Sequence, residues 1–260
     1  MIQQGSAYWL KNQDSQNSHF NLLELASTQR AITNYVKILT GREIPVDFVD
    51  PRGDSMTDGE SIEIASRISH KNVDEVVGLA LHEASHCVLT DFKIVKKLGN
   101  VILQDHKYKH LFPNRDHVFL FTNFMEDRRI DDFVYNSAPG YKAYYESMYE
   151  SSFFNDTINK GLKGTEYRTE TWESYMFRII NIFNPNSDLD ALYNLRKIYD
   201  IIDLDNINRL KSTRDSIEVA MEITDIIRAS IIVEKMINHD DFDKSTLKES
   251  HKKEGEKNDV

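Results

Sequence analysis

The 260-residue sequence predicts a mainly helical α+β protein, and three observations support this fold class. Long proline-free stretches carry apolar residues at spacings of three and four, the period of an α-helix with one buried face. A β-rich stretch at 44–49 and an alternating stretch at 61–66, preceded by the turn residues Asp58 and Gly59, predict a small sheet near the amino terminus. The chain is also long enough to bury a sizeable core.

The predicted elements follow from these patterns in chain order. The first helix covers 21–40 and ends at Gly41, because glycine accepts the left-handed backbone that commonly follows a helix. After the sheet, residues 72–99 contain no proline and predict one long helix. Further helices are expected at 116–135, 142–154, 165–183, 189–202 and 207–238, separated by glycines and by the Asn-Pro-Asn-Ser turn at 184–187.

We expect three segments along the chain. Residues 1–145 hold the sheet and the first long helices and form the core. Residues 146–238 form a helical subdomain packed on it. Residues 239–260 carry many charges and almost no large apolar side chains, so they are expected to be a disordered tail or a linker.

Charge and composition exclude several classes of protein. The formal net charge is −10 and the pI about 5.4, with no basic block that could neutralise a phosphate backbone, so we expect no nucleic-acid partner. No apolar run approaches the roughly 20 residues of a membrane helix, and the amino terminus does not resemble a signal peptide. A single cysteine, Cys87, fits a reducing compartment. We therefore expect a cytoplasmic protein that does not bind membranes.

The stretch GLALHEASHCVLTDF at 78–92 contains a metal-binding pattern. His82 and His86 are four residues apart, so on a helix both imidazoles lie on one face and can bind the same ion. Glu83 is rotated by about 100° from His82, which lets it reach a water on that ion. The alternative is a helix that carries two histidines without a metal.

A hydrolytic zinc site takes three protein ligands, so a further ligand must come from elsewhere in the chain. The stretch FTNFMEDRRIDDF at 121–133 offers carboxylates on a helix with a partly apolar face, and Glu126 is the best candidate. Asp127, Asp131 and Asn123 are candidates for holding an imidazole N–H behind the ligands. In the alternative interpretation, these acids pair with the two arginines that follow them on a surface helix.

Four motifs together resemble a known family. They are TDG at 57–59, LHEASHCVLTDF at 81–92, NFMEDRRID at 123–131 and SAPGY at 137–141. In this order they resemble the metallopeptidase-like domain found beside von Willebrand factor A domains, including the cobaltochelatase-subunit-like group, over about residues 50–145. The resemblance implies a zincin-like core of the gluzincin type, with Zn²⁺ as cofactor and Glu126 as third ligand. The sequence departs from the family at Asp131, where the family usually has glutamate.

The expected function is zinc-dependent hydrolysis of a peptide bond in a peptide or protein substrate, with Glu83 as general base. The strand at 61–66 could hold an extended substrate by edge pairing, or be purely structural. Tyr141 and His117 are candidate donors to the oxyanion or contacts to the substrate. Two alternatives stay open: a weakly active or inactive metal-containing adaptor, working with an AAA-type ATPase or a von Willebrand factor A partner, and a helical structural protein without metal.

Overall fold

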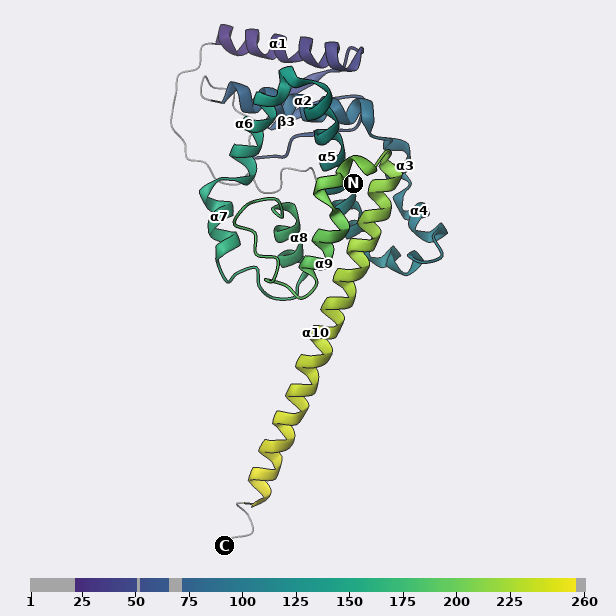
Figure 1. The fold of residues 1–260 in the computed structure, drawn as a ribbon, viewed down its shortest axis with the longest axis vertical. Coiled ribbons are helices and arrows are strands. Elements are labelled where there is room, and N and C mark those ends of the chain that lie inside the picture. Colours follow the sequence, from purple (N-terminus) through teal and green to yellow (C-terminus); the bar gives the residue numbers. More distant parts are fainter. Residues whose placement is uncertain (1–21, 51, 66–71, 256–260) are drawn as a thin grey trace.

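The computed structural model describes residues 22–50, 52–65 and 72–255, and it confirms the mainly helical α+β fold (Figure 1). The elements are α1 (Leu22–Thr40), β1 (Val46–Val49), β2 (Met56–Thr57), β3 (Ile62–Ala65), α2 (Val73–Leu89), α3 (Phe92–Lys96), α4 (Leu98–Gln104), η1 (Lys109–Asn114), α5 (Arg115–Ser137), η2 (Pro139–Tyr141), α6 (Lys142–Phe153), α7 (Asp156–Lys163), α8 (Trp172–Ile180), α9 (Leu195–Ile202), η3 (Leu204–Arg209) and α10 (Thr213–Gly255). None of the described helices is long and apolar enough to span a lipid bilayer.

The three strands form one sheet in the order β1-β3-β2, with β3 parallel to β1 and antiparallel to β2. The predicted turn between β2 and β3 is confirmed. Gly59 has a φ of +89°, a conformation that side chains rarely adopt, and Asp58 Oδ1 accepts from the backbone N–H groups of Glu60 and Ser61. Since β3 has a neighbour on each side, it is the central strand. The prediction that it offers an edge to substrate is therefore wrong for 62–65, and residue 66 lies outside the described residues.

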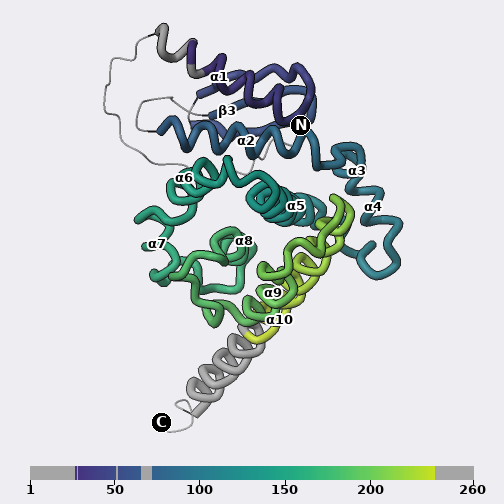
Figure 2. Tube along the Cα trace, turned by 45° about the horizontal axis from the view of Figure 1, so that its top comes forward, coloured from purple at the N-terminus to yellow at the C-terminus, as the bar shows by residue number. Residues whose placement is uncertain are grey.

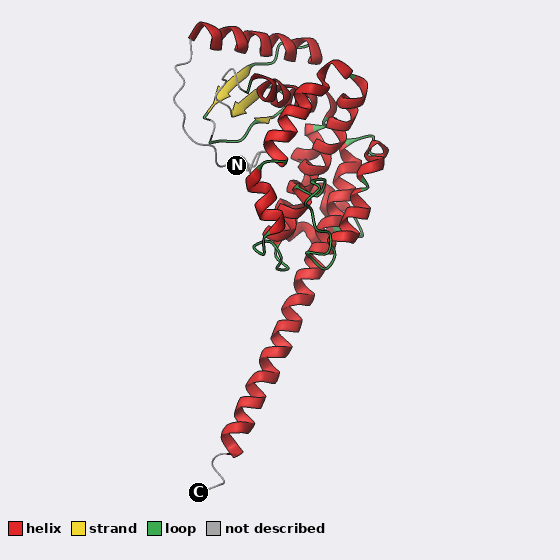
Figure 3. Cartoon of the chain, turned by 60° about the vertical axis from the view of Figure 1, so that its left-hand side comes forward, coloured by secondary structure: helices red, strands yellow, loops and turns green. Residues whose placement is uncertain are grey.

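Helices α1 and α2 contact each other and pack on the same face of the sheet (Figure 3), whose other face carries the exposed Asp47 and Glu63. As predicted, α1 ends before Gly41, whose φ is +66°. Apolar residues at helical spacing on α1 and α2 meet the inward side chains of the sheet in one buried cluster. That cluster contains Ile32, Val36, Ile44, Ile62, Ile64, Val76, Ala80 and Ala84. Burial of this face fixes α2 against the sheet and leaves its other faces to contact α5 and α6.

The helix expected at 72–99 is interrupted after Leu89. Thr90 has an extended ψ of 130°, and Asp91 accepts hydrogen bonds from the backbone N–H groups of Lys93 and Ile94, which starts α3 in a new direction. The Asp91 backbone N–H also donates to Thr213 Oγ1 on α10. Capping by Asp91 and this long-range hydrogen bond outweigh the helical propensity of the segment.

Helix α5 lies between α2 on one side and α10 on the other (Figure 2). Its bounds agree closely with the helix predicted at 116–135. The largest apolar cluster joins α5 to α8, α9 and α10 and includes Phe121, Met125, Ile179, Ile198 and Ile227. A carboxylate on α5 can therefore face either the histidine helix or α10, depending on its position around the helix axis.

Several helices in the second half of the chain differ from the prediction; α9 begins at Leu195 rather than 189, and α10 begins at Thr213, after η3, rather than at 207. The helix expected at 165–183 is reduced to α8, because Thr171 Oγ1 caps it by accepting from the Ser174 N–H, and α7 forms where no helix was expected. Helix α10 extends to Gly255 and so covers most of 239–260, whose assignment as a disordered tail or a linker stays a prediction. The division of the chain into segments at residues 145 and 238 stays a prediction. Helix α6 spans the first of these boundaries and packs on α2.

Candidate metal centre

His82 and His86 lie one turn apart on α2, on the face that meets α5. His82 is buried, and His86 is half-buried. Asp127 of α5 completes a group in which one ligand atom from each residue lies within 4.8 Å of the others. Asp127 Oδ1 is 3.1 Å from His86 Nε2 and 3.7 Å from His82 Nε2. The three side chains therefore converge from two helices.

The spacing of these atoms fits a transition-metal ion. Four ligands at about 2.0–2.2 Å around zinc in a tetrahedron stand about 3.3–3.6 Å apart. The two distances from Asp127 Oδ1, 3.1 and 3.7 Å, bracket that separation. Two imidazoles and one carboxylate suit zinc among several divalent metals, and the identity of the metal is not set by this group alone. The prediction of a metal site is thus supported at the level of a buried His-His-Asp group.

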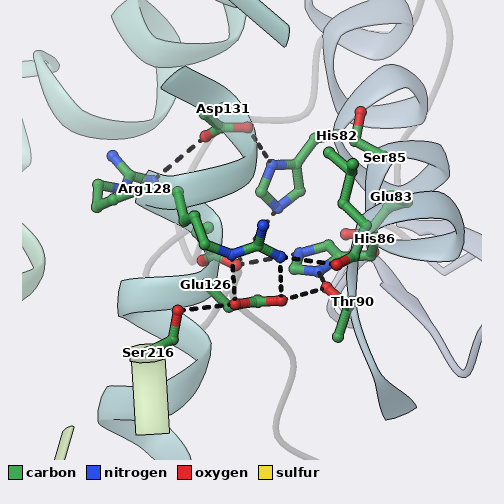
Figure 4. Close-up of polar contacts among 12 residues, drawn as sticks. His82, Glu83, Ser85, His86, Thr90, Glu126, Arg128, Asp131 and Ser216 are labelled. Carbon is green, nitrogen blue, oxygen red and sulfur yellow. Dashed lines mark hydrogen bonds and ion pairs between the residues drawn. The ribbon is translucent and has the colours of Figure 1, made fainter. Parts of the chain in front are cut away.

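Hydrogen bonds behind the two imidazoles turn both Nε2 atoms toward Asp127. His82 Nδ1 donates to Asp131 Oδ1 at 2.8 Å (Figure 4), and Asp131 Oδ2 accepts from the hydroxyl of Tyr149 at 2.6 Å. His86 Nδ1 donates to Thr90 Oγ1 at 3.0 Å. A carboxylate or hydroxyl behind a ligand histidine fixes its orientation and raises its basicity. Asp131 lies where the sequence analysis expected such a residue.

Glu126 does not join the ligand group; it faces α10. Its carboxylate accepts from Arg129 Nη2 at 2.6 Å and Nε at 3.0 Å, and from the hydroxyls of Thr90, Thr213 and Ser216 at 2.8 Å each (Figure 4). The reason is geometric, because residues 126 and 127 are about 100° apart around α5. The structure therefore brings Asp127, and not Glu126, to the two histidines, and it pairs Glu126 with an arginine inside the protein.

Glu126 is nevertheless connected to the site. The Thr90 hydroxyl donates its one hydrogen to Glu126 Oε1. Toward His86 it therefore acts as the acceptor, and His86 Nδ1–H is the donor. Thr90 and Glu126 thus support the imidazole of His86 by two successive hydrogen bonds, in the same way that Asp131 supports the imidazole of His82. Sequence reasoning missed Thr90, although a threonine four residues after His86 on a helix is a recognisable partner. It also missed Tyr149, for which no local signal exists.

Glu83 follows His82 on α2 and is 3% exposed. Burial raises its pKa above the usual value for glutamate, and the nearby His82 and His86 only partly offset this effect. For His82, burial lowers the pKa, but the charge and hydrogen bond of Asp131 outweigh it and raise the pKa to about 10 in the metal-free protein. The site thus combines Glu83, a carboxylate with a raised pKa, with His82, an imidazole that Asp131 orients by a hydrogen bond.

The remaining predicted site residues lie in other contacts. Tyr141 packs edge-on against Tyr35, with ring centroids 5.6 Å apart, and His117 stacks on Trp172 at 3.8 Å. Neither belongs to the His82–His86–Asp127 group, and these contacts give no support to a role at an oxyanion. Asn123 is half-buried on α5, one helical turn before Asp127.

No protein-family model, curated protein or solved structure matches this chain. The chemistry of the site therefore has to be argued from its own residues and distances.

Proposed function

We propose that the chain is a zinc peptidase in which His82, His86 and Asp127, rather than the Glu126 of a gluzincin-type site, hold the ion and Glu83 is the general base. The observation that carries this proposal is the convergence of three ligand atoms within 4.8 Å, with Glu83 buried beside them on α2. Three protein ligands leave a fourth position for water, the arrangement of hydrolytic rather than structural zinc.

When bound, zinc supplies a water of lowered pKa and polarises the scissile carbonyl. Glu83 would accept a proton from that water and return it to the leaving amine. Its raised pKa suits this role, because a higher pKa makes the carboxylate a stronger base. Asp131 and Thr90 keep the imidazoles oriented, so that little reorganisation accompanies binding of the ion.

The strand that an extended substrate could join is β2 rather than β3. β2 is an edge strand of the sheet, and Thr57 Oγ1 lies 3.2 Å from Cys87 Sγ, next to His86 in the chain. A peptide added along this edge would run beside α2 and present its backbone near the site.

The test is Glu83→Gln, which keeps the size of the side chain and removes its basicity. We expect zinc content, measured by elemental analysis, to match wild type, while cleavage of a broad peptide library falls by about 10²–10⁴-fold. A chelator should abolish cleavage in the wild-type protein. If both proteins bind zinc and neither cleaves any peptide, the peptidase proposal fails and the metal-containing adaptor is favoured.

A further inference from the structure

An open cavity of about 470 Å³ lies next to the candidate metal centre, bordered by α5, α6 and η3 and by Phe154 and Phe183. Its walls are mainly apolar and aromatic and include Tyr145, Phe154, Phe183, Leu204 and Ile207. This size and lining are typical of sites that bind small ligands or single side chains. Of the described residues, neither the three candidate ligands nor Glu83 lines it, so the cavity is separate from the space between α2 and α5.

The ionisable groups around the cavity give it a negative charge. Asp131 is balanced by His82 and lies 3.6 Å from Arg128. Asp132, Glu146 and Glu150 also line the cavity, and the two glutamates are exposed at its mouth. A cation with an apolar body complements such a site, whereas an anion would be repelled.

Arg128 supplies a further requirement for the ligand. It is 8% exposed, and its guanidinium lies over the rings of Tyr149, Phe183 and Phe153 at 4.9, 5.0 and 5.3 Å from their centroids. Its Nε–H has no acceptor among the described residues, although the residue lines the cavity. A buried donor without an acceptor is unfavourable; this Nε is covered by protein atoms, so a carbonyl oxygen of a ligand supplies the acceptor when one of the surrounding aromatic side chains moves aside.

We propose that this cavity binds a peptide segment in which an apolar residue is followed by lysine or arginine. The apolar side chain contacts Phe154, Phe183 and Leu204. The basic group meets Glu146 and Glu150 at the mouth, and a peptide carbonyl accepts from Arg128. A simple amine lacks the carbonyl, and a neutral peptide gains nothing from the acidic mouth.

The proposal is tested by calorimetric titration of the chelator-treated protein with acetyl-Phe-Arg-amide and acetyl-Phe-Glu-amide. We expect the arginine peptide to bind at least about tenfold more tightly, since exposed charge pairs each contribute up to about fivefold. Combining Glu146→Gln with Glu150→Gln should weaken its binding by about three- to tenfold. Glu218→Gln, at an exposed position on α10 outside the cavity, is the matched control and should leave binding unchanged.

Leu204→Trp fills the cavity and should abolish binding of the arginine peptide, with thermal unfolding used to verify that the variant is folded. Equal binding of the two peptides, or binding that neither variant affects, overturns the proposal. If Leu204→Trp does not fold, the glutamate pair decides. Zinc and hydrolysis take no part in this titration, so its failure is distinguishable from failure of the proposed peptidase activity.

Discussion

Replacing Glu126 with glutamine tests which carboxylate of α5 belongs to the metal centre. In the structure this side chain is 2% exposed and accepts two hydrogen bonds from Arg129 and three from hydroxyl groups. Glutamine has nearly the same shape but no charge, so the buried Arg129 guanidinium loses its counter-ion. Burial raises the pKa of Glu126, but Arg129, Ser216 and Thr213 outweigh this effect and lower it overall, which shows that the structure stabilises the charged form.

The expected loss of stability is about 3–5 kcal/mol, the usual effect of removing one partner of a buried ion pair. For a chain of this size, each kcal/mol lowers the melting temperature by about 2–4 °C, so the decrease should be about 6–20 °C. Zinc affinity should fall by no more than the roughly 10–100-fold that is typical of residues behind a ligand. Thr90→Val interrupts the same hydrogen-bond chain and should lower zinc affinity to a similar degree.

The assay is thermal unfolding of metal-free and zinc-loaded protein, combined with elemental analysis. Asp127→Asn is the matched variant: it should lose bound zinc and the zinc-dependent increase in stability, about 2.7 kcal/mol at 100 times the dissociation constant. Its metal-free form should be less destabilised than Glu126→Gln, because His86 is the single hydrogen-bond partner found for Asp127 among the described residues. Complete loss of zinc from Glu126→Gln, with unchanged metal-free stability, would show that Glu126 is the ligand and refute the geometric argument.

Three further predictions concern the neighbourhood of the site. Asp131→Asn should lower zinc affinity by about 10–100-fold, measured by competition with a chromogenic chelator, because it weakens the orientation of His82. The raised pKa of His82 means that its stabilising contribution to the metal-free protein is fully present below about pH 6.5 and is lost as the pH rises through about 10, which urea unfolding across this range can follow. Gly78→Ala should destabilise the protein by about 1–3 kcal/mol in thermal unfolding, because the added Cβ would collide with the carbonyl oxygen of Tyr144.

Two of these predictions have a control within the chain. Gly140→Ala adds the same methyl group where no atom lies within 4 Å, and it should leave stability nearly unchanged. For the pH series, Asp131→Asn removes the main cause of the raised pKa of His82, so loss of stability above neutral pH should become smaller. A pH profile that is identical in this variant would contradict the role given to the Asp131–His82 pair.

The histidine helix was predictable because its signal is local. The spacing of His82, Glu83 and His86 places two candidate ligands and a candidate base on adjacent turns of a helix whatever the rest of the fold does. Ala80 and Ala84 of the predicted apolar side of α2 do lie in the cluster shared with the sheet, whereas Val88 is 53% exposed. The turn at Gly59 and the end of α1 at Gly41 are also local, because both depend on a positive φ that glycine adopts without strain.

Tertiary contacts decided which acid meets the histidines. Glu126 and Asp127 are adjacent in the sequence and differ by about 100° around α5, a difference that periodicity in a half-polar helix does not resolve. The packing of α5 on α10 turns Glu126 toward Arg129, Thr213 and Ser216 and leaves Asp127 facing α2. The sequence alone determined that a metal site could be built on α2; the rotation of α5, fixed by long-range packing, determined the residue that completes it.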